Sequence, residues 1–170
     1  MQPLSPMQPP IDGLRLVGFE NLAAGEVRTR LLARRSEFWA GSGWTDEAVR
    51  ALHDPLFFHQ LGGFGALALL PDDTEAGYLL GVVSADRLAV VHALAVHPDH
   101  RRRGVGAALV ERFARLAMTV GARMLQAVVV PTDSAGTALG TRLGAAVAPS
   151  PSHAGPGADR LVLTRSLPLG

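Results

Sequence analysis

The stretch LAVVHALAVHPDHRRRGVGA, residues 88–107, joins an apolar strand to an amphipathic helix through a turn rich in arginine and glycine. Gly104 and Gly106 have no Cβ atoms, so the backbone can approach a ligand closely there. The first N–H groups of the following helix lack intrahelical partners and together carry about +0.5 charge. The sequence therefore predicts an anion-binding turn with phosphate as its natural ligand.

Other uses of this glycine pattern can be weighed by spacing. A dinucleotide-binding turn needs a third glycine, where Leu109 stands, and an acidic residue on the next strand, 124–130, which has none. A P-loop needs a lysine, and the chain contains none. The remaining alternative is a plain helix start with a solvated arginine run.

The segment Arg101–Ala107, directly after the strand that ends in Leu94-Ala95-Val96, resembles the coenzyme A signature of the GNAT superfamily of N-acetyltransferases, R/Q-x-x-G-x-G/A after a strand. The resemblance implies that the turn amides hold the CoA pyrophosphate and that the strand pairs its backbone with the pantetheine arm. It extends in coarse pattern from Leu14 to Leu167. The residues expected to bind acetyl-CoA are Leu94, Ala95, Val96, Arg101, Arg102, Arg103, Gly104, Val105, Gly106 and Ala107, and we count Asp133 with them.

Composition indicates a small soluble enzyme. With 170 residues and 48% apolar content, residues 13–170 are expected to form one domain after a disordered tail, 1–12, in which Met7 is an alternative start. There is no cysteine for a disulfide or a thiolate site, and we expect no metal. A net charge of +1 and the lack of aromatic residues around the arginine run argue against nucleic-acid binding. No apolar run reaches the ~20 residues of a membrane span, so we expect a cytoplasmic protein.

Apolar periodicity predicts an α/β chain in the order β-α-α-β-β-β-α-β-α-β-β, and the resemblance implies a mixed, mostly antiparallel sheet flanked by helices. This is also the order of the resembled family. Thr45 and Asp133 are expected to cap helices, and Gly121 and Gly144 to end them. The expected strands are 14–19, 64–70, 77–84, 88–96, 124–130, 145–149 and 161–166.

His92 is the candidate general base. An alkylammonium titrates near 10.4, so the acceptor amine must lose a proton before it attacks a thioester, and an imidazole titrating at ~6.5 suits that task. The string His92–His97 resembles aralkylamine N-acetyltransferases, which use two histidines two residues apart; the first would fall at Val90, so half the pair is missing. The alternative is a core histidine bonded to a backbone carbonyl. Strand alternation puts His92 on the face of Leu94 unless a bulge, usual in the family, shifts it.

The last helix lacks the tyrosine that in most relatives protonates the departing thiolate, because that position falls at Gly140. Glycines recur there at 136, 140 and 144. They serve either close packing or an acyl group larger than acetyl. A free thiol titrates near 8.5, so the thiolate is still a tolerable leaving group.

The segment Ser36–Trp44 would wall the acceptor pocket in the resembled fold. Its two tryptophans could stack an aromatic or apolar amine, with Glu37, Asp46 or Glu47 attracting its charge, or they are half-buried core residues. We therefore expect an N-acyltransferase that passes an acyl group directly from acyl-CoA to a small amine or peptide amine, with a homodimer left open. The alternative is a non-catalytic acyl-CoA sensing module.

Overall fold

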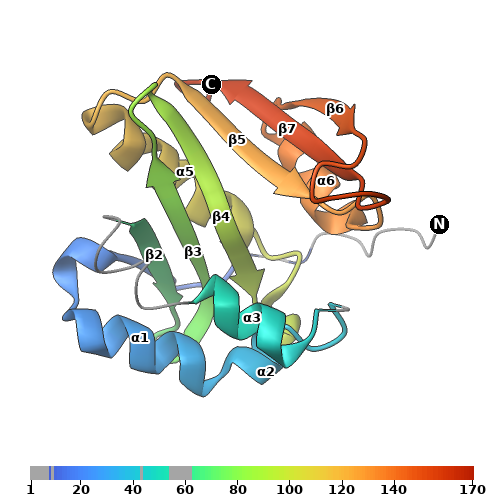
Figure 1. Cartoon of the computed structure of the whole chain (residues 1–170). Helices are drawn as coiled ribbons and strands as arrows, with labels where there is room; N and C mark the ends of the chain where they lie inside the picture. The colour runs from blue at the N-terminus through green and yellow to red at the C-terminus, as the bar shows by residue number, and fades with distance from the viewer. Residues whose placement is uncertain (1–7, 9, 43, 54–62) are drawn as a thin grey trace.

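The computed structural model describes residues 8, 10–42, 44–53 and 63–170, and a seven-stranded sheet in the order β1-β2-β3-β4-β5-β7-β6 forms the centre of this part of the chain (Figure 1). Neighbouring strands are antiparallel except β4 and β5, which are parallel. This confirms the mixed, mostly antiparallel sheet. The strands are β1 Arg15–Gly18, β2 Phe64–Leu69, β3 Glu75–Val83, β4 Leu88–Val96, β5 Met124–Val129, β6 Ala146–Ser150 and β7 Arg160–Ser166.

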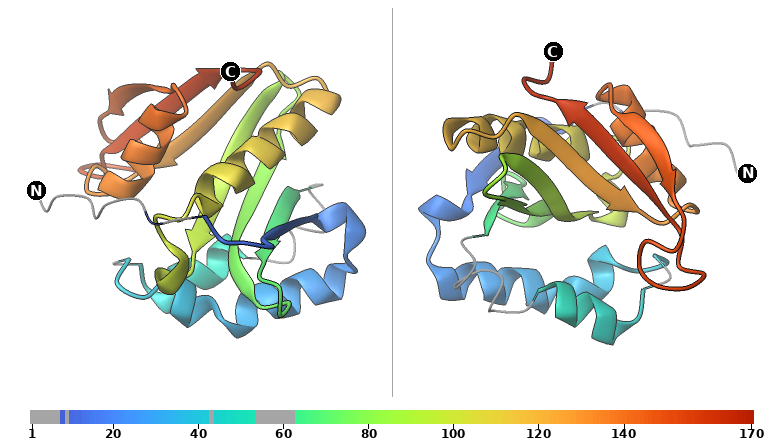
Figure 2. Two further views of the ribbon diagram at one scale, coloured as in Figure 1. Left: turned by 180° about the vertical axis from the view of Figure 1, so that it is seen from behind. Right: turned by 45° about the horizontal axis from the view of Figure 1, so that its top comes forward.

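Helices cover both faces of the sheet (Figure 2). The long helix α5 and helix α6 lie on one face, and α1 and α2 pack on the other. The predicted first helix is broken at Arg34, whose φ of −113° and ψ of 15° are not helical. The helices are α1 Ala24–Ala33, α2 Arg35–Phe38, α3 Asp46–Leu52, α5 Val105–Thr119 and α6 Ser134–Arg142, with 3-10 turns at Phe19–Asn21 and Pro98–His100.

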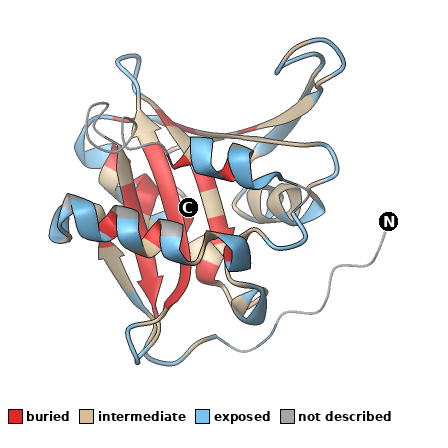
Figure 3. Cartoon of the chain, turned by 60° about the horizontal axis from the view of Figure 1, so that its bottom comes forward, coloured by how far each residue is buried: buried red, intermediate tan, exposed pale blue. Residues whose placement is uncertain are grey.

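Strand β3, in which seven of nine residues are buried, lies between these two layers (Figure 3). Leu79 faces the cluster built with α5, while Tyr78 and Leu80 face the cluster built with α1 and α2. Leu109 and Phe113 of α5 are buried as their helical spacing predicts. Val120 is 52% exposed, because it follows the last turn of the helix. The core thus fixes the position of α5 relative to β4, which the site requires.

Local capping follows the sequence. The side chain of Thr45 accepts a hydrogen bond from the Ala48 N–H at 3.1 Å, and Asp133 accepts one from Gly136 at 2.8 Å. Helix α6 ends in a Schellman motif, with the Gly144 N–H bonded to Thr141 and the next N–H bonded to the Gly140 carbonyl. These predictions are confirmed.

Most of the expected disordered tail, residues 1–7 and 9, lies outside the described residues. Within the described part, Ile11 is half-buried against the α5 cluster, and the Gln8 N–H donates to the Arg102 carbonyl at 2.9 Å. The N-terminal segment therefore reaches the arginine–glycine turn. None of the described helices is long and apolar enough to cross a membrane.

Candidate active site

Strands β4 and β5 pair only over their first residues. The parallel register runs from Leu88 opposite Met124 to Val91 opposite Ala127 and then stops. Beyond it, β4 stays paired with β3 up to Val96, and β5 with β7 up to Val129. The two strands diverge in Figure 1, and each keeps one backbone edge without a strand partner. Such an edge offers N–H and C=O groups to an extended ligand.

A β-bulge coincides with the end of this pairing. Gly81 is opposite Val91 and Leu80 is opposite Ala93, so His92 is the extra residue on β4. The bulge reverses the side-chain parity of the strand: Val91 and Leu94 both pack toward α5, and Ala93 packs toward α1 and α2. His92 contacts the backbone of Leu52 on α3, so it does not share the face of Leu94 that simple alternation predicts.

The arginine–glycine turn adopts left-handed conformations at Arg102 and Gly104, with φ of 63° and 82°. These bring the start of α5 to the open end of the splayed strands. The first intrahelical donor is the Ala108 N–H, which bonds to the Gly104 carbonyl, so the N–H groups of residues 105–107 have no intrahelical acceptor. No acidic residue lies in the first turn. This end of α5 has the geometry and charge of an anion site.

The three arginines of the turn differ in their contacts. Arg101 donates to the carbonyls of Val96 and Phe38, at 3.1 and 3.3 Å, and so braces the turn against β4 and α2. Arg103 donates to the Pro10 carbonyl at 3.5 Å. The buried Nε of Arg102 and Nδ1 of His100 have no hydrogen-bond partner among the described residues. Burial and repulsion by His97 and Arg103 lower the pKa of His100.

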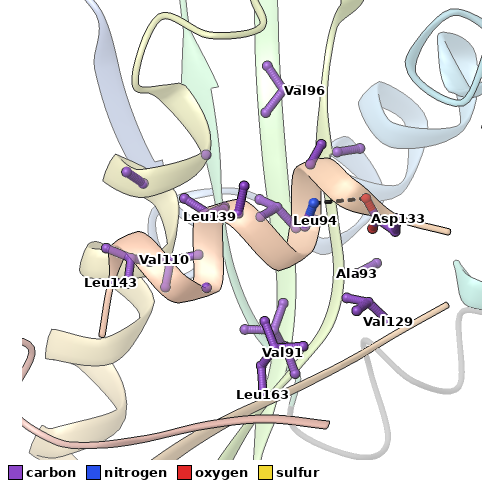
Figure 4. A pocket seen from close by; sticks show the side chains of 18 of the residues that line it. Val91, Ala93, Leu94, Val96, Val110, Val129, Asp133, Leu139, Leu143 and Leu163 are labelled. Atoms are coloured by element: carbon purple, nitrogen blue, oxygen red, sulfur yellow. Dashed lines mark hydrogen bonds between the residues drawn. The ribbon is translucent and has the colours of Figure 1, made fainter. Parts of the chain in front are cut away.

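One pocket of about 750 Å³ joins these features (Figure 4). It runs between the unpaired ends of β4 and β5, past the start of α5, and along α6. The pocket brings together every expected site residue except Arg103, which does not line it. Among its described lining residues, five arginines stand against one carboxylate, Asp133. The pocket therefore suits an anionic ligand.

His92 lines the pocket next to Ala93. Desolvation lowers the pKa of its imidazole, and the hydrogen bond to the Leu52 backbone opposes that shift only in part. The ring is therefore neutral at pH 7, the state in which a histidine accepts a proton.

The small residues of α6 have separate local causes. A Cβ atom at Gly140 would overlap the side chain of Leu163 on β7, and one at Gly136 would overlap the carboxylate of Asp133. Gly144 has a φ of 78°. The helix is therefore glycine-rich because it packs closely on β7 and caps itself, and Leu163 fills the space beside Gly140.

The α2–α3 segment forms another wall, as expected of residues 36–44. Phe38, Trp39, Trp44 and Leu52 line the pocket, and the two indole rings lie 5.6 Å apart. The acids expected to attract an amine do not line it, and two of them are paired elsewhere: Glu37 with Arg34 at 2.8 Å, Asp46 with Arg35 at 2.8 Å. Pairing with these guanidinium groups lowers the pKa of both carboxyls.

A buried polar chain behind this wall was not anticipated. The Trp39 Nε1–H donates to the Tyr78 hydroxyl at 2.7 Å, and that hydroxyl lies 2.8 Å from Nε2 of His53. Nδ1 of His53 is 2.6 Å from the Val49 carbonyl. The one sequence signal was that Tyr78 is the only tyrosine in the chain and stands in an apolar strand.

The described histidines lie apart from one another or in other contacts. Within the described ranges, no group of three or more His, Asp or Glu side chains is arranged to hold a metal ion. His97 instead contacts Glu37 at 3.3 Å and the ring of Phe38 at a centroid distance of 5.6 Å.

Comparison with solved structures shows the same fold in several acetyltransferases. A protein of the GNAT family from Desulfovibrio desulfuricans superposes with a TM-score of 0.71 at 18% identity, covering 91% of this chain and 99% of that one. A phosphinothricin acetyltransferase from Sinorhizobium meliloti in complex with acetyl-CoA gives 0.66 at 21% identity, covering 92% and 90%. An aminoglycoside 6'-N-acetyltransferase from Enterococcus faecium gives 0.67 at 13% identity, covering 91% and 98%.

No curated protein matches the chain by sequence. The model of the acetyltransferase (GNAT) family, however, matches residues 29–145, which include the splayed strand β4, the arginine–glycine turn and α6. By this match the chain belongs to the acetyltransferase (GNAT) family.

Proposed function

We propose that this protein transfers an acetyl or slightly larger acyl group from acyl-CoA directly to a primary amine, with both substrates bound at once. The observation that carries the proposal is the pair of unpaired edges on β4 and β5, which open into one pocket with the arginine–glycine turn. An edge of this kind holds an extended amide-bearing arm, and the turn holds its phosphates. Acetyl-CoA in the Sinorhizobium meliloti structure of the same fold supports this assignment.

The residues present fit CoA chemically. The N–H groups at the start of α5 and the buried Nε of Arg102 are donors that an anion would satisfy. A Cβ at Gly104 would meet nothing within 4 Å, so the turn leaves room there. When bound, CoA supplies the acyl group as an activated thioester.

His92 is the proposed proton acceptor. Its neutral imidazole takes a proton from the acceptor ammonium, directly or through water, which frees the nitrogen lone pair for attack. Unpaired N–H groups on the edge of β4 are donors for the thioester oxygen. Position 140 is a glycine, so no tyrosine hydroxyl at that position protonates the departing thiolate. The thiolate is only moderately basic, so it can leave without that proton.

The test measures CoA binding and acyl transfer separately. CoA should raise the melting temperature, and each of acetyl-, propionyl- and succinyl-CoA should be screened for amine-dependent release of free thiol. Gly104→Ala should remove most of the thermal shift and of the thiol release.

Gly157→Ala is the matched control. Gly157 also has a positive φ, 73°, with nothing within 4 Å of a Cβ, but it lies in the β6–β7 loop and does not line the pocket. Both variants carry a similar backbone strain of about 1–2 kcal/mol, so only a ligand-specific loss distinguishes them. Equal CoA shifts in the two variants would contradict the phosphate assignment, and a thermal shift without thiol release from any amine would contradict transfer.

A further inference from the structure

The acceptor end of the pocket is built from aromatic and aliphatic side chains. Phe38, Trp39, Trp44 and Leu52 line the part contributed by α2, α3 and their connection, beside His92. Trp44 is 42% exposed although it is among the largest apolar residues of the chain. A large apolar side chain left open in a pocket is a common feature of small-molecule sites.

The polar atom of Trp39 is already used inside the protein. The Val49 carbonyl can only accept, so Nδ1 of His53 carries the proton and donates to it. Nε2 of His53 is then an acceptor and takes the Tyr78 hydroxyl proton, while the hydroxyl oxygen accepts from Trp39. The chain of bonds fixes the Trp39 ring and leaves only its apolar surface for a ligand.

The charges around this wall are also satisfied within the protein. Glu37 is bonded to Arg34 and lies 3.3 Å from His97, and Asp46 is bonded to Arg35 and Arg50. The one lining carboxylate, Asp133, caps α6 through Gly136. A second cationic group on an acceptor would meet no unpaired carboxylate among the described lining residues, and burying it without a partner is costly.

We propose that the acceptor is a primary amine whose remaining part is aromatic and uncharged, with Trp39 as the specificity-determining residue and Tyr78 as the residue that positions it. The inference rests on the proposed acyl transfer. It predicts that polycationic acceptors, such as the aminoglycosides named for the enzyme from Enterococcus faecium, are poor substrates, even though the folds coincide.

The experiment compares four primary amines whose amino group carries different substituents: 2-phenylethylamine, 2-methoxyethylamine, spermidine and β-alanine. With acetyl-CoA saturating, kcat/KM for thiol release should be about tenfold or more higher for 2-phenylethylamine than for the other three, the factor expected from one aromatic contact in a pocket. Equal or faster use of spermidine would overturn the inference and leave acyl transfer intact.

Two variants test the residues. Trp39→Ala should raise the KM for 2-phenylethylamine about tenfold more than it raises the KM for 2-methoxyethylamine, with little change in the affinity for CoA. Tyr78→Phe should raise the KM for 2-phenylethylamine with little change in kcat. If Tyr78→Phe does not fold, Trp39→Phe replaces it as the test, because this variant leaves the Tyr78–His53 hydrogen bond in place. A fall in kcat with every amine alike would show a merely structural role and overturn the assignment.

A binding measurement keeps the inference testable if no amine is acylated. The chain has two tryptophans, and both line this wall, so intrinsic fluorescence reports on it directly. On CoA-saturated protein, 2-phenylethylamine should quench the fluorescence at lower concentration than spermidine does. If no thiol is released but 2-phenylethylamine still quenches at the lower concentration, the proposed acyl transfer is wrong and the aromatic binding site is supported. If spermidine quenches at an equal or lower concentration, or neither amine quenches, the inference is wrong.

Discussion

The role of His92 depends on one extra residue in β4. Alternation counted back from Leu94 would put it on the α5 face, but Val91 already takes that face and His92 is the extra residue of the bulge. The bulge instead brings it to the Leu52 backbone, at a pocket that also contains the tryptophans. His92 is exposed on the pocket side, so it is not a core residue, and its hydrogen bond to the Leu52 backbone is the contact that the alternative hypothesis predicts. The catalytic role stays a proposal.

Replacing His92 by alanine should lower kcat about 10²–10⁴-fold with little change in CoA affinity, because a positioned base is lost. Since burial lowers the pKa of His92, the wild-type rate should rise with pH through an apparent pKa below 6.5. The measurement is the pH profile of kcat for both proteins. An identical profile in His92→Ala would return His92 to a structural role.

Gly140 and Leu163 should be coupled in stability. Gly140→Ala gains roughly 1 kcal/mol of helix propensity but forces the new Cβ against the Leu163 side chain, so it should not stabilise the protein. In a Leu163→Ala background the same change should be more favourable by about 1 kcal/mol. Urea unfolding of the four proteins gives the coupling.

Gly25→Ala is the control for this cycle, since a Cβ there meets nothing within 4 Å and the residue is exposed on α1. It should stabilise by about 0.5–1 kcal/mol in either background. A coupling near zero between Gly140 and Leu163 would instead mean that the two are not in contact.

At the scale of elements, α2 and α3 are short and gain their position from contacts with the sheet. Phe38 packs edge-on against Tyr78 with centroids 5.2 Å apart, and His53, 1% exposed, follows the end of α3. Arg101 ties the α2 backbone to the arginine–glycine turn. The α2–α3 wall of the pocket and this turn are therefore linked by a hydrogen bond, although 63 residues separate Phe38 from Arg101 in sequence.

Acid should destabilise the protein through His53. Burial, with a smaller contribution from the charges of His92 and Arg35, lowers its pKa below 6.5 in the folded state. A histidine with a lowered folded pKa contributes its full stability above the unfolded pKa and loses it as pH falls below about 6.5, because the unfolded chain binds the proton first.

The His53→Gln variant should therefore lose less unfolding free energy than the wild type between pH 7.5 and pH 5, measured by urea unfolding. At pH 7.5 the variant should be less stable than the wild type. His100 also has a lowered pKa, so part of the acid sensitivity should persist. If the variant and the wild type lose stability equally over this range, His53 is not the group responsible.

The molecule as a whole is one sheet that opens between β4 and β5. Each half keeps its own hydrogen-bonded partners, β3 for β4 and β7 for β5, so the gap costs no paired backbone within either half. Helix α5 covers the first half, and α6 contacts β7 and the residues of β4 that face α5. The pocket is thus a property of the assembled sheet.

CoA should protect the gap from hydrogen exchange. In the peptide covering residues 92–96 the edge of β4 has no strand partner, whereas residues 88–91 pair with β5. Adding CoA should slow exchange of 92–96 and of 128–130 more than that of 88–91, measured by mass spectrometry. If CoA raises the melting temperature but slows hydrogen exchange equally in these peptides and in β3, CoA binds elsewhere.

Much of this fold could be read from local patterns. The caps at Thr45 and Asp133, the glycine ends at Gly121 and Gly144, and the final β6–β7 hairpin are confirmed, because each depends on residues near in sequence. The break at Arg34 was missed, since nothing in the apolar spacing interrupts the helix. Glu37 and Asp46, expected to attract an amine, are instead paired with Arg34 and Arg35, and sequence alone does not identify these partners.

By itself the sequence predicted the arginine–glycine turn before α5, which we propose binds phosphate. Glycine at 104 and the absence of acid in the following turn are local properties that make a helix start attract phosphate wherever the helix lies. Only the tertiary structure decided which way His92 faces, that Leu163 fills the space beside Gly140, and that Tyr78 and His53 hold Trp39. These contacts join residues distant in the chain, and their geometry is set by strand register and packing, which short-range periodicity does not encode.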